Sequence, residues 1–125
     1  MPRSTRVLCV HEDRLSLNTR KKVLENAGFS VDWSGTGMKG LVQFRFFTPD
    51  IVVLDYDLPD IAGDIVALGM RRINAPVPLL MVAPNIFIPP TAIAAADAWI
   101  LKGDSPEILL GKIHELLGNT HSMAA

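Results

Sequence analysis

The sequence is poor in cysteine, in net charge and in long apolar runs. Its single cysteine, Cys9, cannot form an intramolecular disulfide, and a thiol inside the apolar run of residues 7–10 is expected to be a small buried side chain. The formal net charge is −1, with 12 Lys and Arg against 13 Asp and Glu, which leaves no basic footprint for nucleic acid. These shortages are typical of a protein from a reducing compartment that does not bind nucleic acid directly.

No segment has the length of a signal-peptide core or a membrane span. The N-terminal residues lead into only four apolar residues, 7–10, so we expect a cytoplasmic protein without membrane contact. The chain has 125 residues, of which 49% are hydrophobic and 20% charged, a size and composition typical of one compact domain. We expect this single domain to span residues 1–125, with a core over about 5–118 and a flexible tail over 119–125.

Short apolar runs alternate with amphipathic segments, which is the pattern of βαβ units around a parallel sheet. We predict strands at residues 7–10, 31–33, 51–54, 79–82 and 98–101. Helices are predicted after each strand: one from about residue 15, then 38–46, 64–72 and 91–96, and a last one with Ser105 as N-cap and Pro106 at its first position. The expected fold class is α/β, with a doubly wound parallel sheet.

Polar side chains follow four of the predicted strands, at the edge where open α/β sheets bind ligands. These residues are His11, Glu12, Asp13, Asp55, Asp57, Asn85, Lys102 and Asp104. Carboxylates at such an edge favour a hard divalent cation, and a nearby lysine could neutralise a phosphoryl group. Polar residues also collect at any solvent-facing strand end, and spacing alone leaves both interpretations open.

Four segments resemble the receiver domain of bacterial response regulators, in order and with the spacing of that family. They are residues 7–13, 51–63, 79–83 and 99–102, and the most specific is the pattern Asp-x-x-Leu-Pro-Asp-x-x-Gly that begins at Asp55. The resemblance covers about residues 5–118. It implies a flavodoxin-like (βα)5 three-layer sandwich with strand order 2-1-3-4-5, and a role in two-component phosphorelay signalling and not as an enzyme.

The resemblance gives each matching residue an expected role. Asp55 stands where receivers accept a phosphoryl group from a phosphohistidine of a sensor histidine kinase or phosphotransfer protein, and Lys102 stands where the family lysine neutralises that group. Glu12, Asp55 and the backbone carbonyl of Asp57 would ligate Mg²⁺. Gly63, in the loop that shapes the site, is expected to adopt a positive φ angle.

His11 departs from the family pattern, because receivers usually place two acids after the first strand and here only Glu12 is acidic. Imidazole is a poor Mg²⁺ ligand and a better one for softer ions, so the site would bind Mg²⁺ weakly, take Mn²⁺ or another ion, or go without one. His11 could equally be a solvent-facing residue that only fills space. Asp13 could restore the missing charge, although its position better suits an N-cap of the first helix.

The switch positions of the family are also altered. Ala83 stands where a Ser or Thr hydroxyl normally bonds the phosphoryl group, and such a bond to a charged group contributes about 1.5–3 kcal/mol. Trp99 occupies the usual Tyr or Phe position, and we expect its bulky indole to be static. Gly103 replaces the proline that follows the family lysine, so a trans peptide is expected after Lys102.

The loop over residues 84–90 is apolar and stiffened by proline where receivers usually have a polar loop. Ile86, Phe87 and Ile88 could form a partner surface on the fourth-helix face, which receivers commonly use to dimerise or to bind targets, or the loop could pack back onto the core. Nothing after the last helix suggests an output domain. Output would therefore pass through an unidentified protein or a homodimer, unless the chain is a piece of a longer protein.

Two hypotheses follow from these residues. In the first, the chain is an atypical receiver that is phosphorylated on Asp55 and signals by protein–protein contact, as the retained Asp55 and Lys102 suggest. In the second, it is a phosphorylation-independent pseudo-receiver that binds partners constitutively, as His11, Ala83 and Gly103 suggest. A small flavodoxin-like enzyme or nucleotide binder is disfavoured because no glycine-rich phosphate loop follows the first strand.

Overall fold

The structure, a computed structural model, describes residues 4–85 and 87–124, without the side chains of residues 14, 15, 17 and 119–124. Five parallel strands form one sheet in the order β2-β1-β3-β4-β5. The strands are β1 (Arg6–Val10), β2 (Ser30–Ser34), β3 (Ile51–Asp55), β4 (Leu79–Ala83) and β5 (Ala98–Leu101). The predicted α/β fold class and strand order are confirmed.

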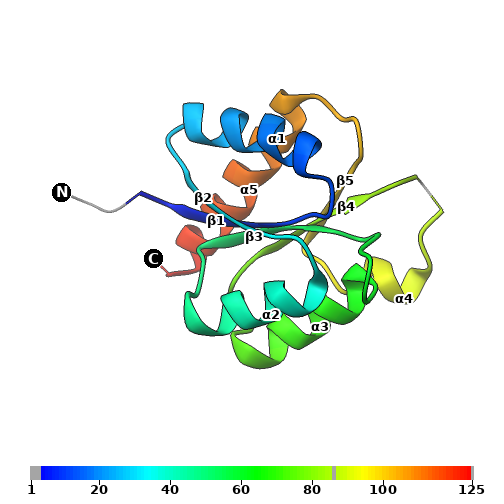
Figure 1. Ribbon diagram of the computed structural model, residues 1–125. Helices are drawn as coiled ribbons and strands as arrows, with labels where there is room; N and C mark the ends of the chain where they lie inside the picture. Colours follow the sequence, from blue (N-terminus) through cyan, green and yellow to red (C-terminus); the bar gives the residue numbers. More distant parts are fainter. Residues whose placement is uncertain (1–3, 86, 125) are drawn as a thin grey trace.

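A helix follows each strand and covers the sheet in two layers. Figure 1 shows α1 and α5 on one face, and α2, α3 and α4 on the other. The helices are α1 (Arg14–Asn26), α2 (Gly37–Phe46), α3 (Gly63–Ile73), α4 (Pro90–Ile93) and α5 (Pro106–Ala124). Within residues 4–85 and 87–124, no helix has the length and apolar character needed to cross a membrane.

Two helices end at other residues than the sequence suggested. The α4 helix has only 4 residues. It ends early because Asp97, just before β5, is already bonded to the start of β4. The backbone N–H of Asp97 donates to Leu79 O, and the Asp97 carboxylate accepts the N–H of Leu79. The α5 helix continues to Ala124 instead of giving way to an irregular tail at 119. Gly118 does not adopt the left-handed conformation that would end a helix there.

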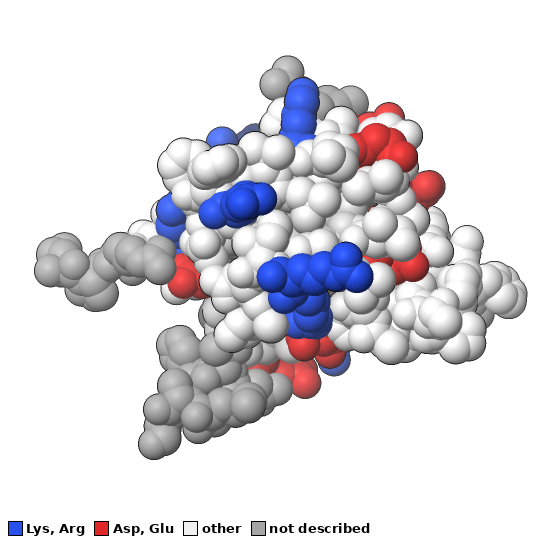
Figure 2. Space-filling view, turned by 90° about the horizontal axis from the view of Figure 1, so that it is seen from below, with Lys and Arg blue, Asp and Glu red and all other residues white. Residues whose placement is uncertain are grey.

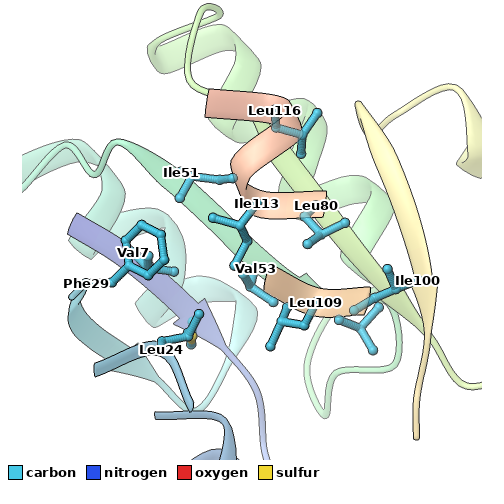
Figure 3. Close-up of a cluster of buried hydrophobic side chains, with 12 residues drawn as sticks. Val7, Leu24, Phe29, Ile51, Val53, Leu80, Ile100, Leu109, Ile113 and Leu116 are labelled. Atoms are coloured by element: carbon cyan, nitrogen blue, oxygen red, sulfur yellow. The ribbon is translucent and has the colours of Figure 1, made fainter. Parts of the chain in front are cut away.

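Alternate residues of the central strands face opposite layers of helices, as the period of a strand requires. Val7, Cys9 and Val53 belong to the apolar cluster beneath α1 and α5, which Figure 3 shows together with Leu109 and Ile113 of α5. The intervening side chains enter a second cluster with residues of α2 and α3, namely Leu8, Val10, Val52, Leu54, Phe44, Val66 and Met70. Burial on both faces explains why these strands read as continuous apolar runs.

Candidate functional site

A hollow of about 100 Å³ lies at the carboxyl ends of β1, β3, β4 and β5. It brings together most of the polar residues that the sequence placed after the strands. The lining residues are His11, Glu12, Asp13, Asp55, Asp57, Val82, Pro84 and Lys102. This convergence is the expected consequence of parallel strands that all end at one edge.

Asp55 is the last residue of β3 and lies at the floor of this hollow, with 6% of its surface exposed. The chain around it is held by backbone bonds, because Tyr56 N–H donates to Val82 O at 2.9 Å and Gly63 N–H donates to Tyr56 O at 2.8 Å. The Oδ1 atom accepts a hydrogen bond from Arg20 Nη1 at 3.3 Å. The Oδ2 atom is in close contact with Nδ1 of His11. Both carboxylate oxygens therefore have a protein partner.

His11 is buried, with 2% of its surface exposed, so the interpretation of it as a solvent-facing residue is wrong. Its backbone continues the pairing of β1 with β2, because its N–H donates to Ser34 O at 3.0 Å. Its carbonyl accepts the indole N–H of Trp33 at 2.7 Å. These two bonds hold the imidazole beside Asp55, and neither ring nitrogen makes a hydrogen bond to the described residues.

Arg20 is a site residue that sequence reasoning missed. It lies in the middle of α1, and its side chain is only 13% exposed because it reaches down to Asp55. It also lines a second hollow, of about 280 Å³, that runs between α1 and the loop after β5. No motif marks this arginine, since its contact with Asp55 depends on how α1 lies over the sheet.

Lys102 lines the hollow but is exposed, and it is not within ion-pair distance of Asp55 in the described structure. Its backbone N–H donates to Ala83 O at 2.8 Å. The peptide that follows it is trans, as predicted, and Gly103 has a φ angle of +92° that proline could not adopt. Among the described residues, the cation in contact with Asp55 is thus Arg20.

The remaining acids lie at the rim. Glu12 and Asp57 are exposed. Asp13 directly precedes α1, and its Oδ2 accepts the hydroxyl hydrogen of Ser16 at 2.8 Å. This bond joins two side chains and not a side chain to a backbone N–H, so the N-cap role of Asp13 stays a prediction.

The loop after β3 is tied to the start of α2 by Asp60. Its two carboxylate oxygens accept the N–H groups of Gly37 and Met38 at 2.8 and 2.9 Å, and Thr36 Oγ1 accepts the next N–H, that of Lys39. The first three backbone N–H groups of α2, which have no acceptor within the helix, therefore all have a side-chain acceptor. The hydrogen bonds from Met38 and Gly37 lower the pKa of Asp60 below its ordinary value of 3.8.

Gly63 does not have the positive φ angle that the resemblance suggested. Glycine is needed there for space. A Cβ atom at this position would collide with the carbonyl oxygen of Asp55 and lie 2.7 Å from Tyr56 Cα. The close approach of α3 to the end of β3 is what the absence of a side chain allows.

A larger hollow, of about 660 Å³, lies at the edge of the sheet between β2 and α2. Lys39 is the one titratable side chain in its lining, so this hollow offers little chemistry despite its size. Figure 2 shows the face formed by α2 and α3, which is mostly uncharged and is crossed by a few Lys and Arg side chains. The hollow that brings charged and reactive side chains together is the smaller one around Asp55.

Comparison with known proteins decides the family. The family model described as "response regulator receiver domain" matches residues 7–109. The chain belongs to the response regulator receiver family. The crystal structure of a CheY-like receiver domain protein from Methanospirillum hungatei matches with a TM-score of 0.90 and 26% identity, over 97% of this chain and 99% of that chain. The chain is thus a receiver, a signalling module of two-component systems.

Relatives among curated proteins are response regulators of about twice this length. The transcriptional regulatory protein CseB of Streptomyces coelicolor is 33% identical over 121 residues, which are 94% of this chain and 51% of that protein. The cell cycle transcriptional regulator CtrA of Caulobacter vibrioides is 27% identical over 115 residues, which are 90% of this chain and 50% of that protein. The chain spans about half the length of these relatives.

The receiver family implies a bound Mg²⁺, and one similar structure, that of TrrA from Thermotoga maritima, is a complex with Mg²⁺ and BeF. The residues of the present receiver do not fit that ion in the described arrangement. Both oxygens of Asp55 already have protein partners. Within residues 4–85 and 87–124, no group of three His, Cys, Asp or Glu side chains is placed to hold a metal ion.

The switch positions of this receiver lie beside the site. Ala83 ends β4 and is buried, with no hydroxyl to offer. Trp99 donates its indole N–H to Ile93 O at 3.0 Å, and its ring centroid is 6.0 Å from that of Tyr56. These contacts tie the indole to the end of α4.

Two of the three expected partner-surface residues are described. Phe87 is 84% exposed, and its N–H is bonded to Asn85 Oδ1 at 2.9 Å. Ile88 is half-buried and lines a hollow of about 320 Å³ with Ile93 and Trp99. Ile86 lies outside the described residues. The loop is therefore divided, with Phe87 open to solvent and Ile88 packed against the fold.

Proposed function

We propose that this receiver accepts a phosphoryl group on Asp55 from a phosphohistidine of a sensor histidine kinase or phosphotransfer protein, and passes the signal on by protein–protein contact. The observation that carries the proposal is the position of Asp55 at the floor of the strand-end hollow, with Lys102 on its rim. A carboxylate that ends a buried strand is fixed in place, which favours in-line attack on phosphorus. In a longer protein, an attached output domain would be the first recipient of the signal.

The proposed transfer forms one bond and breaks one. A carboxylate oxygen of Asp55 attacks phosphorus, the P–N bond of the phosphohistidine breaks, and the imidazole leaves with that electron pair. A carboxylate oxygen has two lone pairs, so an oxygen that already has one protein partner keeps another for attack. The positive charge of Arg20 and of Lys102 would stabilise the oxygens of the incoming group.

The test is the intact mass of the protein after incubation with a small-molecule phosphodonor such as acetyl phosphate, with Mg²⁺, with Mn²⁺ and with a chelator. We expect a single phosphoryl adduct that is absent from Asp55→Asn. Glu25→Gln, an exposed acid of α1 that does not line the hollow, is the control and should still be modified. No adduct under any of these conditions, while an ordinary receiver is modified in parallel, would refute the proposal.

A second candidate function is a constitutive protein-binding module, in which Asp55 is not phosphorylated. Three observations favour it: both oxygens of Asp55 have partners, Ala83 offers no hydroxyl, and Trp99 is bonded to Ile93 O. The surface of this module would include Phe87, whose exposed ring is the most open large apolar side chain described. A partner, or a second copy of the chain, that binds wild type and Asp55→Asn equally but loses affinity for Phe87→Ser would support this alternative.

A further inference from the structure

We infer that Arg20, together with His11, takes the place of the divalent cation at Asp55, so that this receiver keeps its phosphoacceptor site neutralised with its own side chains and binds neither Mg²⁺ nor Mn²⁺ there. The inference deepens the proposed function, because it concerns the same carboxylate. The sequence left open a weak Mg²⁺ site, a site for Mn²⁺ or another ion, and a site without an ion, and the inference selects the last of these. The geometry around Asp55 carries it.

An ion in this hollow would need a carboxylate oxygen of Asp55. Oδ1 of Asp55 is bonded to Arg20 Nη1 at 3.3 Å, and Oδ2 is in contact with His11 Nδ1. The three side chains are 8%, 13% and 3% exposed for Asp55, Arg20 and His11, respectively. An ion that bound Oδ1 would have to displace Arg20, and the guanidinium would then lose its partner in a largely buried position, which is costly.

The residues around Asp55 offer an ion few further ligands. His11 stands where an acid would complete the pair after β1, and its ring is held by the backbone bonds of that residue to Ser34 and Trp33. The Asp13 carboxylate is engaged with Ser16, and Glu12 and Asp57 lie at the exposed rim. Mg²⁺ keeps several of its waters and is bound through one or two protein carboxylates. In the described structure both oxygens of Asp55 are engaged, and no group of three His, Cys, Asp or Glu side chains is placed to hold an ion.

A side chain can neutralise the charge at this site in place of an ion. Phosphoryl transfer to a carboxylate depends mostly on positioning and on neutralising charge. A guanidinium that is held in place can neutralise charge as a metal ion does. Arginine side chains carry a positive charge in proteins, and Arg20 supplies that charge from α1 as part of the chain. The proposed transfer to Asp55 would then proceed without a divalent cation.

The experiment measures ion binding directly, independently of phosphorylation. Wild type, Arg20→Gln, His11→Asp and the double variant are titrated with Mg²⁺ and with Mn²⁺, and binding is followed by the melting temperature and by tryptophan fluorescence. Trp33 is a local probe because its indole is bonded to the His11 carbonyl. Arg45→Gln, an exposed arginine near the end of α2, is the matched control.

We expect no ion-dependent change in wild type or in Arg45→Gln. His11→Asp restores the acidic pair, and with Arg20→Gln it frees both oxygens of Asp55. The double variant should gain a site, with a rise in melting temperature of about 5 °C when the ion is at about ten times its dissociation constant. Each single variant should gain weaker binding, and either one keeps the test valid where the double variant does not fold.

Two results would overturn the inference. One is a wild type that binds Mg²⁺ or Mn²⁺ as Arg20→Gln does, because Arg20 would then not occupy the position of the ion. The other is a set of folded variants that never gain binding, because Arg20 and His11 would then not be what excludes the ion. A wild type that binds no ion and forms no phosphoryl adduct would sink the proposed function and leave this inference standing.

Discussion

Adding one methyl group at Gly63 should damage both stability and the site. The new Cβ of Gly63→Ala would collide with the carbonyl oxygen of Asp55 and lie 2.7 Å from Tyr56 Cα, whereas an ordinary contact is at least 3.4 Å. Both obstacles are backbone atoms, so no side chain can rotate away and the end of β3 must move. Overpacking of this kind costs about 1–3 kcal/mol. The melting temperature should fall by about 4–12 °C for a chain of this length.

The same substitution elsewhere in the chain has the opposite expected sign, which makes it a sharp control. Gly111 is exposed within α5, and a Cβ there would meet nothing within 4 Å. Gly111→Ala should stabilise the protein by about 0.5–1 kcal/mol, because alanine loses less conformational entropy in a helix. Thermal and urea unfolding, followed by circular dichroism, measures the stability of Gly63→Ala and of Gly111→Ala against wild type. A Gly63→Ala protein as stable as wild type would refute the reasoning about the loop.

Three further outcomes are expected. The pKa of Asp60 is lower in the folded state than its ordinary value of 3.8. The ionised carboxylate therefore stabilises α2 fully above pH 3.8, and this stabilisation is lost as the pH falls through the lowered pKa. The melting temperatures of wild type and Asp60→Asn should differ at pH 7 and converge in acid. Burial raises the pKa of Cys9 to about 12, so iodoacetamide at pH 8 should label this thiol far more slowly than an exposed thiol, and unfolding in urea should restore the ordinary rate. Asp55→Asn should lower stability by about 1–3 kcal/mol in urea titrations, because it leaves Arg20 without its partner, and a gain in stability would show instead that Asp55 is mainly repelled by neighbouring acids.

The sequence predicts the fold well because its signals are local and mutually consistent. Strands buried on both faces require continuous apolar runs, and residues 51–54 and 79–82 are such runs. Ser105 and Pro106 mark the start of α5 by their own chemistry, and the Ser105 hydroxyl accepts the N–H of Ile108. The end of α5 and the length of α4 were less predictable. Both depend on what the following residues contact, and the bonds of Asp97 to Leu79 lie 18 residues apart in the chain.

Most members of the candidate site could be predicted from the sequence, but their contacts could not. Asp55, Asp57 and Lys102 could be placed at one edge because the ends of parallel strands must meet there. The role of Gly63 was misjudged, since a sequence does not tell a glycine that needs a left-handed φ angle from one that needs space. Only the packed structure distinguishes them, through the backbone of Asp55 and Tyr56.

Arg20 shows where sequence reasoning stops, and why this matters for function. It is one of several basic residues of α1, and nothing in its neighbours along the chain separates it from Lys21 or Lys22, which are exposed. Its importance comes from a partner 35 residues away. A buried carboxylate must be neutralised by something, so the identity of its partner decides whether an ion is needed. His11 alone leaves open a weakened ion site or a site without an ion, whereas the contact of Arg20 with Asp55 is the observation that favours a site without an ion.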